Sequence, residues 1–243
     1  LRKHIVTWYH DYLCHPGETR TEETIRQHLW WPNIRGNVRE HVDKCTACQC
    51  GKKKRLKYGH LPPKEAEFRP WQHLCVDTIG PYRIRRKGKK ELVFQAVTFI
   101  DPATGWFERR ECKTKRADEV ANHIEQTWLS RYPWPEYITY DGGPEFKAEF
   151  GDLLRREYSN IKTKPSSKRN PQANAILERA HGTIGNMIRT FNVEDINLDE
   201  ADPFAGLVSA VGFAIRSTYH TTLQSTPGQL VFGRDMIFPI EHV

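Results

Sequence analysis

Two pairs of metal-ligand residues near the start of the chain constrain its fold most strongly. Four residues separate His10 from His15, two separate Cys45 from Cys48, and 29 residues lie between the pairs. Each pair can bind a metal from one short turn, and a tetrahedral Zn²⁺ accepts four such ligands. Folding must then close the distance between the pairs. We therefore predict one structural zinc ion held by these four residues.

The sequence between the two pairs predicts two helices. Thr19 and Thr21 are candidate N-caps for a helix over residues 22–31, which Pro32 would end. The next helix would align four residues on one face and deliver the cysteine pair: Ile34, Val38, Val42 and Cys45. A unit of about 45 residues has a small core, so zinc is expected to supply much of its folding free energy.

Other cysteines and histidines in this segment are weaker candidates as ligands. The side chain of Cys14 would point in a different direction from that of its neighbour His15, and Cys50 would break the two-residue spacing. The remaining histidines are expected to pack or to lie on the surface: His4, His28 and His41. Six cysteines without a signal peptide argue against a disulfide framework. The chain starts without methionine, so we interpret it as a piece of a longer product or as a shortened form of one.

Three carboxylates form a second spaced set, Asp77, Asp141 and Glu178, with 63 and 36 residues between them. Phosphoryl transfer with two divalent cations about 4 Å apart needs oxygen ligands that converge from separate elements. Asp77 is expected within one strand and Asp141 at the end of another, which can bring the two carboxylates together. Spacing alone leaves rivals for the third ligand and one acid at a strand end that could be mistaken for catalytic: Glu145, Glu149, Asp152 and Asp101.

Glu178 lies on the polar face of a helix predicted over residues 171–192. The apolar stripe of this helix contains Ile176, Ala180, Thr183, Ile184, Met187, Ile188 and Phe191. The opposite face carries Glu178 with Gly182 and Gly185, and a glycine inside a helix costs about 1 kcal/mol relative to alanine. Two glycines beside the acid indicate a close approach on that face, either by a DNA backbone or by a packed element.

The rest of the chain predicts a linker and a mixed α/β domain. Residues 51–70 are basic, contain paired prolines and lack apolar periodicity, so they are interpreted as an exposed linker. Strands are predicted at 73–79, 91–100, 104–112, 136–141 and 161–164, and further helices at 117–128, 145–158 and 200–218. The net charge of +7 suits a polyanionic partner, although a merely basic soluble protein would share it. No apolar run is long enough to span a membrane.

Residues of both sets resemble a known family. HDYLCHPG, TIRQHLWWPNI and VDKCTACQ resemble the HHCC zinc domain of retroviral and LTR-retrotransposon integrases. PWQHLCVDTIGP, ITYDGGPEF and NPQANAILERAHGTIGNMIRT resemble the three blocks of their DDE catalytic core. TTLQSTPGQLVFGRDMIFPI resembles the segment after the core in gypsy-type elements. The resemblance covers nearly the whole chain, in the right order.

The resemblance implies an RNase H-like core, a mixed five-stranded sheet flanked by helices, behind a small helical zinc-binding domain. The implied layout is a zinc domain at 1–49, a basic linker at 50–70, the core at 71–220 and a post-core segment at 221–243. Asp77, Asp141 and Glu178 would be catalytic ligands of Mg²⁺ or Mn²⁺. The implied reaction is 3′-end processing and strand transfer of element DNA into target DNA. The alternative is an inactive, integrase-derived DNA- or chromatin-binding protein.

The resemblance also implies partners and a cellular setting. We expect double-stranded DNA, both element ends and target, and a homo-multimer (dimer or tetramer) assembled on two ends, with no membrane. Production as part of a polyprotein in the cytoplasm and action in the nucleus are implied. Candidate DNA contacts are Lys52, Lys53, Lys54, Arg55, Lys164, Lys168, Arg169, Arg179 and Arg189.

The sequence departs from the family pattern around the third acid. Asn174 and Ala175 replace the usual acidic or polar residue followed by glycine, and His181 stands where an asparagine is common. Gly182 and Gly185 stand where some retroviral relatives place DNA-contacting lysines. These departures bear on how DNA ends are recognised.

Overall fold

The computed structural model describes residues 1–52, 69–86, 89–114, 116–140, 143, 146, 149–165, 171–194 and 203–237. Most of the predicted basic linker, residues 53–68, lies outside this part of the chain. Within the described residues, no helix is both long and apolar enough to cross a membrane.

Four short helices form the N-terminal part of the fold: α1 (Arg2–Tyr12), α2 (Glu18–Arg26), α3 (Ile34–Lys44) and α4 (Thr46–Gly51). The predicted start of the helix over residues 22–31 is wrong, because α2 begins at Glu18 and contains both predicted N-caps, Thr19 and Thr21. Thr21 donates its hydroxyl proton to the carbonyl of Pro16 instead of capping the helix. The predicted face of α3 is confirmed, since Ile34 and Val38 are buried.

A mixed five-stranded sheet forms the centre of the remaining chain, as the sequence predicted. Its strands are β1 (His73–Arg86), β2 (Lys89–Ile100), β3 (Phe107–Glu111), β4 (Tyr137–Tyr140) and β5 (Lys162–Pro165). They lie in the order β3-β2-β1-β4-β5. The pairs β1–β2 and β2–β3 are antiparallel, whereas β1–β4 and β4–β5 are parallel.

The first strand is longer than predicted, because it continues past a bulge. The pairing of β1 with β2 shifts register between Ile79 and Tyr82 and then resumes. Gly80 lies at the bulge with a φ of +97°, and a Cβ there would lie 2.6 Å from the carbonyl oxygen of Phe94. Only glycine fits this close approach with a positive φ. The strand predicted over residues 73–79 therefore continues through this irregular point to Arg86.

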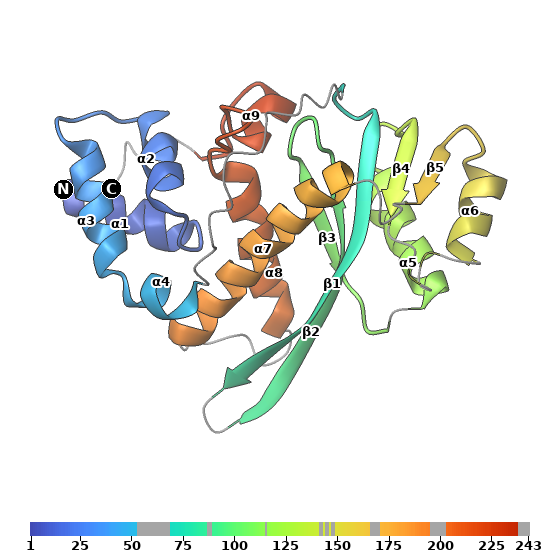
Figure 1. Cartoon of the computed structure of the whole chain (residues 1–243), viewed down its shortest axis with the longest axis horizontal. Helices are drawn as coiled ribbons and strands as arrows, with labels where there is room; N and C mark the ends of the chain where they lie inside the picture. Colours follow the sequence, from blue (N-terminus) through green and yellow to red (C-terminus); the bar gives the residue numbers. More distant parts are fainter. Residues whose placement is uncertain are drawn as a thin grey trace.

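Helices cover both faces of the sheet (Figure 1). The helices α7 (Pro171–Glu194) and α8 (Pro203–Ser217) lie on one face, between the sheet and the N-terminal helices. On the other face lie α5 (Ala117–Ile124), which continues as a π-helical turn over Glu125–Leu129, and α6 (Glu149–Glu157). A short α9 (Pro227–Phe232) follows α8.

Two hydrophobic clusters follow the alternation of side chains along the strands. One cluster joins Leu74 and Val76 of β1 to α5 and α6. The other joins Cys75 and Ile79 to α7 and α8, and it continues without a break into the N-terminal helices, where Tyr9 is fully buried. The N-terminal helices therefore share a core with α7 and α8.

Candidate metal sites

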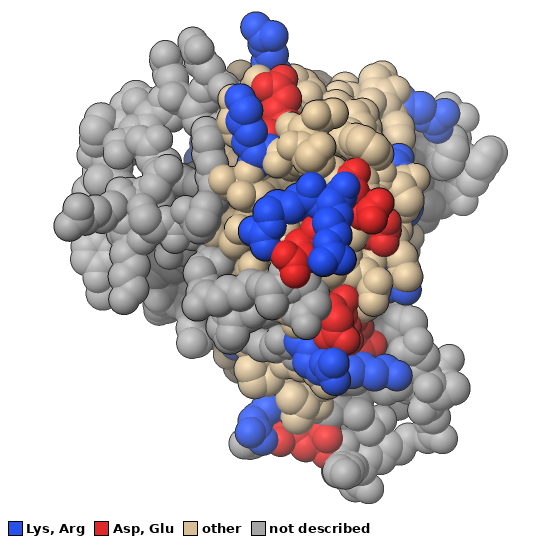
Figure 2. Space-filling model, turned by 90° about the vertical axis from the view of Figure 1, so that its right-hand side faces the viewer, with Lys and Arg blue, Asp and Glu red and all other residues tan. Residues whose placement is uncertain are grey.

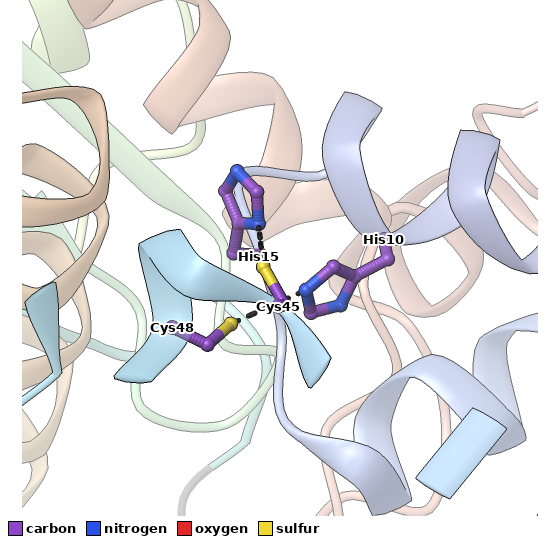
Figure 3. A group of neighbouring side chains, drawn as sticks. All are labelled: His10, His15, Cys45 and Cys48. Atoms are coloured by element: carbon purple, nitrogen blue, oxygen red, sulfur yellow. Dashed lines mark hydrogen bonds between the residues drawn. The ribbon is translucent and has the colours of Figure 1, made fainter. Parts of the chain in front are cut away.

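The four predicted zinc ligands converge in the structure (Figure 3). His10 comes from the last turn of α1, His15 from the loop after it, and Cys45 and Cys48 from the start of α4. Their ligand atoms all lie within 4.8 Å of one another. His10 Nε2 is 3.2 Å from Cys48 Sγ, and His15 Nδ1 is 3.5 Å from Cys45 Sγ.

An unusual turn after α1 brings the second histidine back toward the first. Cys14 and His15 both have a φ of +58°, in the left-handed region that costs non-glycine residues of order 1 kcal/mol or more. The turn is held by hydrogen bonds from the His15 N–H to the His10 carbonyl (2.8 Å) and from the Cys14 N–H to the Asp11 carbonyl (3.1 Å). Such strain is typical of a ligand-holding turn.

Burial sets the protonation of this group when no metal is bound. Burial, aided by neighbouring His15 and Lys52, lowers the pKa of His10 to about 3, so its imidazole is neutral at neutral pH. Burial raises the pKa of Cys48 to about 11, although Lys52 opposes the shift. Two nitrogens and two sulfurs at this spacing fit a tetrahedral Zn²⁺, which takes neutral imidazoles and thiolates and would release the thiol protons on binding.

The rival cysteines lie outside this group of four. Cys14 is buried in the hydrophobic cluster of the N-terminal helices, and Cys50 is exposed. His28 Nε2 lies 3.4 Å from Asp235 Oδ2. The ring centroid of His41 lies 5.1 Å from that of His10, beside the site.

Asp77 lies in the middle of β1, the central strand of the sheet. Its Oδ1 accepts the N–H of Thr78 at 2.7 Å, and its side chain is one quarter exposed. The parallel pairing of β1 with β4 ends with Val76 opposite Tyr140. Asp77 and Asp141 are the next residues along their two segments, and Asp141 itself lies outside the described residues.

His181 of α7 reaches the acid of β1. Its Nδ1 is 3.5 Å from Asp77 Oδ2, and its Nε2 is 3.0 Å from the hydroxyl of Thr98 on β2. Burial lowers the pKa of His181 to about 4, so the ring is neutral at neutral pH. Residues three apart share a helix face, so Glu178 belongs to the face of α7 that meets Asp77. The side chain of Glu178 lies outside the described residues.

Two of the rival acids are accounted for by other contacts. Asp101 is fully buried and accepts hydrogen bonds from the N–H groups of Trp71 and Ala103 and from the hydroxyl of Thr104, so it is structural. Asp152 lies on α6, across the sheet from α7, where it pairs with Arg155. Glu149 also belongs to α6, and Glu145 lies outside the described residues.

Two of the predicted DNA contacts, Arg189 and Lys52, have intramolecular partners in this structure. The Arg189 Nε donates to the carbonyl oxygen of Gly51 at 3.0 Å, and its guanidinium also bonds Asn186. Lys52 Nζ donates to the carbonyl of Pro16 at 3.4 Å, beside the zinc-ligand group. These interactions give both cations a structural role. The other seven fall outside the described residues or side chains: Lys53, Lys54, Arg55, Lys164, Lys168, Arg169 and Arg179.

The close approach predicted at Gly185 is to protein. A Cβ at Gly185 would lie 3.3 Å from the Arg189 guanidinium and 3.4 Å from the hydroxyl of Tyr82 on β1. Of the two explanations for this glycine, packing against a neighbouring element therefore applies. The same face of α7 carries His181 toward the sheet.

Sequence reasoning missed two further groups of metal-ligand type: one adds Asp11 and His41 to His10 of the zinc-ligand group, and the other lies apart from it. Cys112, Glu119 and His123 have ligand atoms within 4.8 Å of one another near the start of α5. Both carboxylate oxygens of Glu119 already accept hydrogen bonds from the backbone of Lys113 and Thr114. This glutamate therefore holds the segment before α5 in place.

Comparisons with known proteins agree with both parts of the fold. Residues 1–54 match the family model of the integrase zinc binding domain. The chain is 29% identical over 227 residues to the retrovirus-related Pol polyprotein from transposon 412 of Drosophila melanogaster, with 93% of the chain covered. It is 25% identical over 239 residues to the transposon Tf2-3 polyprotein of Schizosaccharomyces pombe, with 95% covered. The chain spans 17% of the length of each of these polyproteins.

Solved structures share the fold. A chain of the simian T-cell lymphotropic virus intasome in complex with PP2A regulatory subunit B56 gamma matches 100% of this chain and 78% of its own length, with a TM-score of 0.56 and 15% identity. The HTLV-2 integrase catalytic core domain in complex with magnesium, in its trimeric form, matches 66% of this chain and 95% of its own length, with a TM-score of 0.50 and 17% identity. The chain is therefore integrase-like: it is similar in sequence to retrotransposon polyproteins and has the fold of a retroviral integrase core behind a match to the integrase zinc-binding domain.

Proposed function

We propose that this chain is an integrase that processes the 3′ ends of element DNA and joins them to target DNA by metal-dependent phosphoryl transfer. One observation carries the proposal: His181 of α7 lies 3.5 Å from Asp77 of β1. The contact supports the proposal, because Glu178 precedes His181 by three residues on α7 and would share the helix face that meets β1. Asp141, the residue after β4 in the sequence, would complete a set from three separate segments.

Asp77, Asp141 and Glu178 would hold divalent cations in this site, because carboxylate oxygens suit Mg²⁺ and Mn²⁺. When bound, a pair of such cations activates the attacking hydroxyl or water and stabilises the leaving 3′ oxygen. The chain contributes rigidity. Asp77 is fixed in the central strand, and the Thr78 N–H orients its carboxylate. A ligand held this way loses little conformational freedom when a cation binds.

His10, His15, Cys45 and Cys48 would hold one structural Zn²⁺ in the N-terminal domain. The ion would tie the end of α1 to the start of α4 and so fix the four-helix arrangement. The proposed layout keeps a zinc domain at 1–49, a linker at 50–70, a core at 71–220 and a post-core segment at 221–243. The first boundary falls inside α4.

Double-stranded DNA is the proposed partner, both as element ends and as target. The side of the core that carries α5 and α6 does not suit a DNA backbone, because Figure 2 shows Lys and Arg interspersed with Asp and Glu over its described residues. Exposed pairs such as Arg116–Asp118 and Arg155–Asp152 belong to these helices. The linker, the segment before α7 and α7 itself supply the proposed contacts, through Lys52, Lys53, Lys54, Arg55, Lys164, Lys168, Arg169, Arg179 and Arg189. We also propose that the chain is released from a polyprotein and acts in the nucleus as a homo-multimer.

A strand-transfer assay on the unchanged protein and five variants tests the function. The substrate is a labelled duplex that ends in the terminal sequence of the element encoding the chain, with Mg²⁺ or Mn²⁺. Asp77→Asn, Asp141→Asn and Glu178→Gln should each abolish processing and joining, because each removes a charged ligand from a shared site. DNA binding should survive in all three and should weaken as salt rises, because phosphate contacts dominate affinity.

Asp152→Asn is the matched control, since it removes an exposed acid on the opposite side of the sheet. Its activity should equal that of the unchanged protein. Loss in Glu145→Gln with full activity in Glu178→Gln would mean that the third acid is misassigned. Salt-sensitive DNA binding with no turnover by the unchanged chain would favour the inactive DNA-binding alternative.

A further inference from the structure

The hydrogen bonds around His181 determine which of its ring nitrogens carries the proton. The hydroxyl of Thr98 donates its single proton to the main-chain carbonyl of Asp77, at 3.0 Å. Its oxygen can then only accept from His181, whose Nε2 lies 3.0 Å away. Nε2 is therefore the nitrogen that donates its proton to Thr98, and Nδ1 is the ring nitrogen directed at Asp77.

Nδ1 faces a carboxylate oxygen. His181 Nδ1 and Asp77 Oδ2 are 3.5 Å apart, which exceeds the roughly 2.7–3.2 Å of an N–H···O hydrogen bond. At this separation the two atoms make no direct hydrogen bond. A cation shared by the two atoms would make the arrangement favourable. Two ligand atoms about 2.1 Å from one ion lie roughly 3 to 3.5 Å apart at octahedral or tetrahedral angles, which fits this separation.

The surroundings of the ring resemble those of a metal-bound histidine. Such a histidine usually donates its other N–H to a neighbouring group that fixes the tautomer and the ring orientation. Thr98 supplies that acceptor here, and it is itself fully buried and anchored to the backbone of Asp77. The side chain of His181 is 17% exposed and that of Asp77 is 25% exposed, so a cation could reach both from solvent.

We propose that His181 Nδ1 is itself a ligand, together with Asp77 Oδ2, of a divalent cation at the catalytic site. This inference rests on the proposed function and adds a nitrogen donor to the three carboxylates. Imidazole is a good ligand for transition metals, whereas Mg²⁺ prefers oxygen. The site of this chain should therefore bind Mn²⁺ more tightly than an all-carboxylate site would, with little gain for Mg²⁺.

Pulsed electron paramagnetic resonance of bound Mn²⁺ tests this directly, because it detects coupling between the metal electron spin and a coordinated nitrogen. The full zinc-loaded chain is used, since Zn²⁺ outcompetes Mn²⁺ for the nitrogen and sulfur ligands of the N-terminal site. Histidine labelled with the heavy nitrogen isotope should change the coupling. The unchanged protein should show one histidine nitrogen bound to Mn²⁺.

Two variants separate the metal role from a structural one. In His181→Gln the amide nitrogen can replace Nε2 at Thr98, but no group replaces Nδ1. This variant should lose the nitrogen coupling and bind Mn²⁺ at least about tenfold more weakly, while Mg²⁺ affinity in a competition titration should change by less than about twofold. His4→Gln, at an exposed position on α1, should keep both properties.

The outcomes distinguish this inference from the function on which it rests. Mn²⁺ binding that Asp77→Asn abolishes, but that shows no histidine coupling, would overturn the ligand role of His181 and leave the proposed function standing. Coupling that persists in His181→Gln would overturn it as well. If the chain binds no Mn²⁺ that depends on Asp77, the inference and the proposed two-metal chemistry fail together.

Discussion

Gly51 lies where α4 packs closely against α7, so an alanine there should loosen the junction. Gly51 is the last residue of α4, and its carbonyl accepts the Nε–H of Arg189 at 3.0 Å. A Cβ at this position would lie 3.1 Å from the carbonyl carbon of Arg189, 3.1 Å from the nitrogen of Thr190 and 3.2 Å from the Arg189 oxygen. All three atoms are helix backbone, which cannot rotate away.

The expected loss follows from these distances. Carbon contacts are most favourable at about 3.5–4.0 Å, so the two helices must separate by a few tenths of an ångström. Overpacking of this kind costs about 1–3 kcal/mol. Alanine returns at most about 1 kcal/mol through its higher helix propensity, and less at a helix end. We therefore expect Gly51→Ala to lower the free energy of unfolding by about 1–2 kcal/mol.

Gly206→Ala is the matched control for urea unfolding of the zinc-loaded chain. Gly206 lies inside α8, and a Cβ there would meet nothing within 4 Å. This variant should gain up to about 1 kcal/mol from helix propensity alone. The two substitutions should thus shift the unfolding midpoint in opposite directions. A Gly51→Ala protein as stable as Gly206→Ala would refute the close junction between α4 and α7.

Two further predictions concern buried charge. Glu108→Ala should lower the free energy of unfolding by about 3–5 kcal/mol, because this buried carboxylate accepts a hydrogen bond from Tyr132 and pairs with Arg109 and Arg216. A loss below about 1 kcal/mol in urea melts would contradict the pairing. In zinc-free protein, His10 with its pKa lowered to about 3 stays neutral while the unfolded chain gains a proton below pH 6.5. Stability is then full above pH 6.5 and falls toward pH 3, by about 2 kcal/mol at pH 5. Urea midpoints at pH 7 and 5 should show this fall, and His10→Asn should reduce it.

Local pattern was enough to predict the elements whose structure depends on local sequence. The apolar stripe predicted a helix over 171–192, and α7 spans Pro171–Glu194 with Ile184 and Ile188 buried. The paired spacing of histidines and cysteines predicted a group of four that the fold brings within 4.8 Å. The two ligands of each pair can be predicted from spacing because they lie in one short turn. Only the distance between the two pairs depends on the overall fold.

Prediction failed where distant contacts decide the outcome. The Gly-Pro pair at residues 80–81 is typical of a turn, yet pairing with β2 carries β1 through a bulge to Arg86. The sequence could not predict that the carbonyl of Gly51 accepts the Nε–H of Arg189, because this bond depends on where α4 packs. In the sequence, His181 is only a departure from the family pattern, where an asparagine is common. Its meeting with Thr98, 83 residues away in the chain, requires α7 to lie across β1 and β2.

The helix α7 links these observations, because one rigid element carries three different contacts. Near its C-terminal end, Arg189 joins it to α4 and so to the zinc-ligand group. Its apolar stripe joins it to the sheet through the shared hydrophobic cluster. One face of its first half brings His181 to Asp77. Arg189 lies eight positions after His181, about 12 Å along the helix. An α-helix of that length does not bend enough to absorb a displacement. The position of α4 on α7 therefore also constrains the geometry at Asp77. The N-terminal helices, which share a core with α7, therefore fix one end of the helix that contains Glu178.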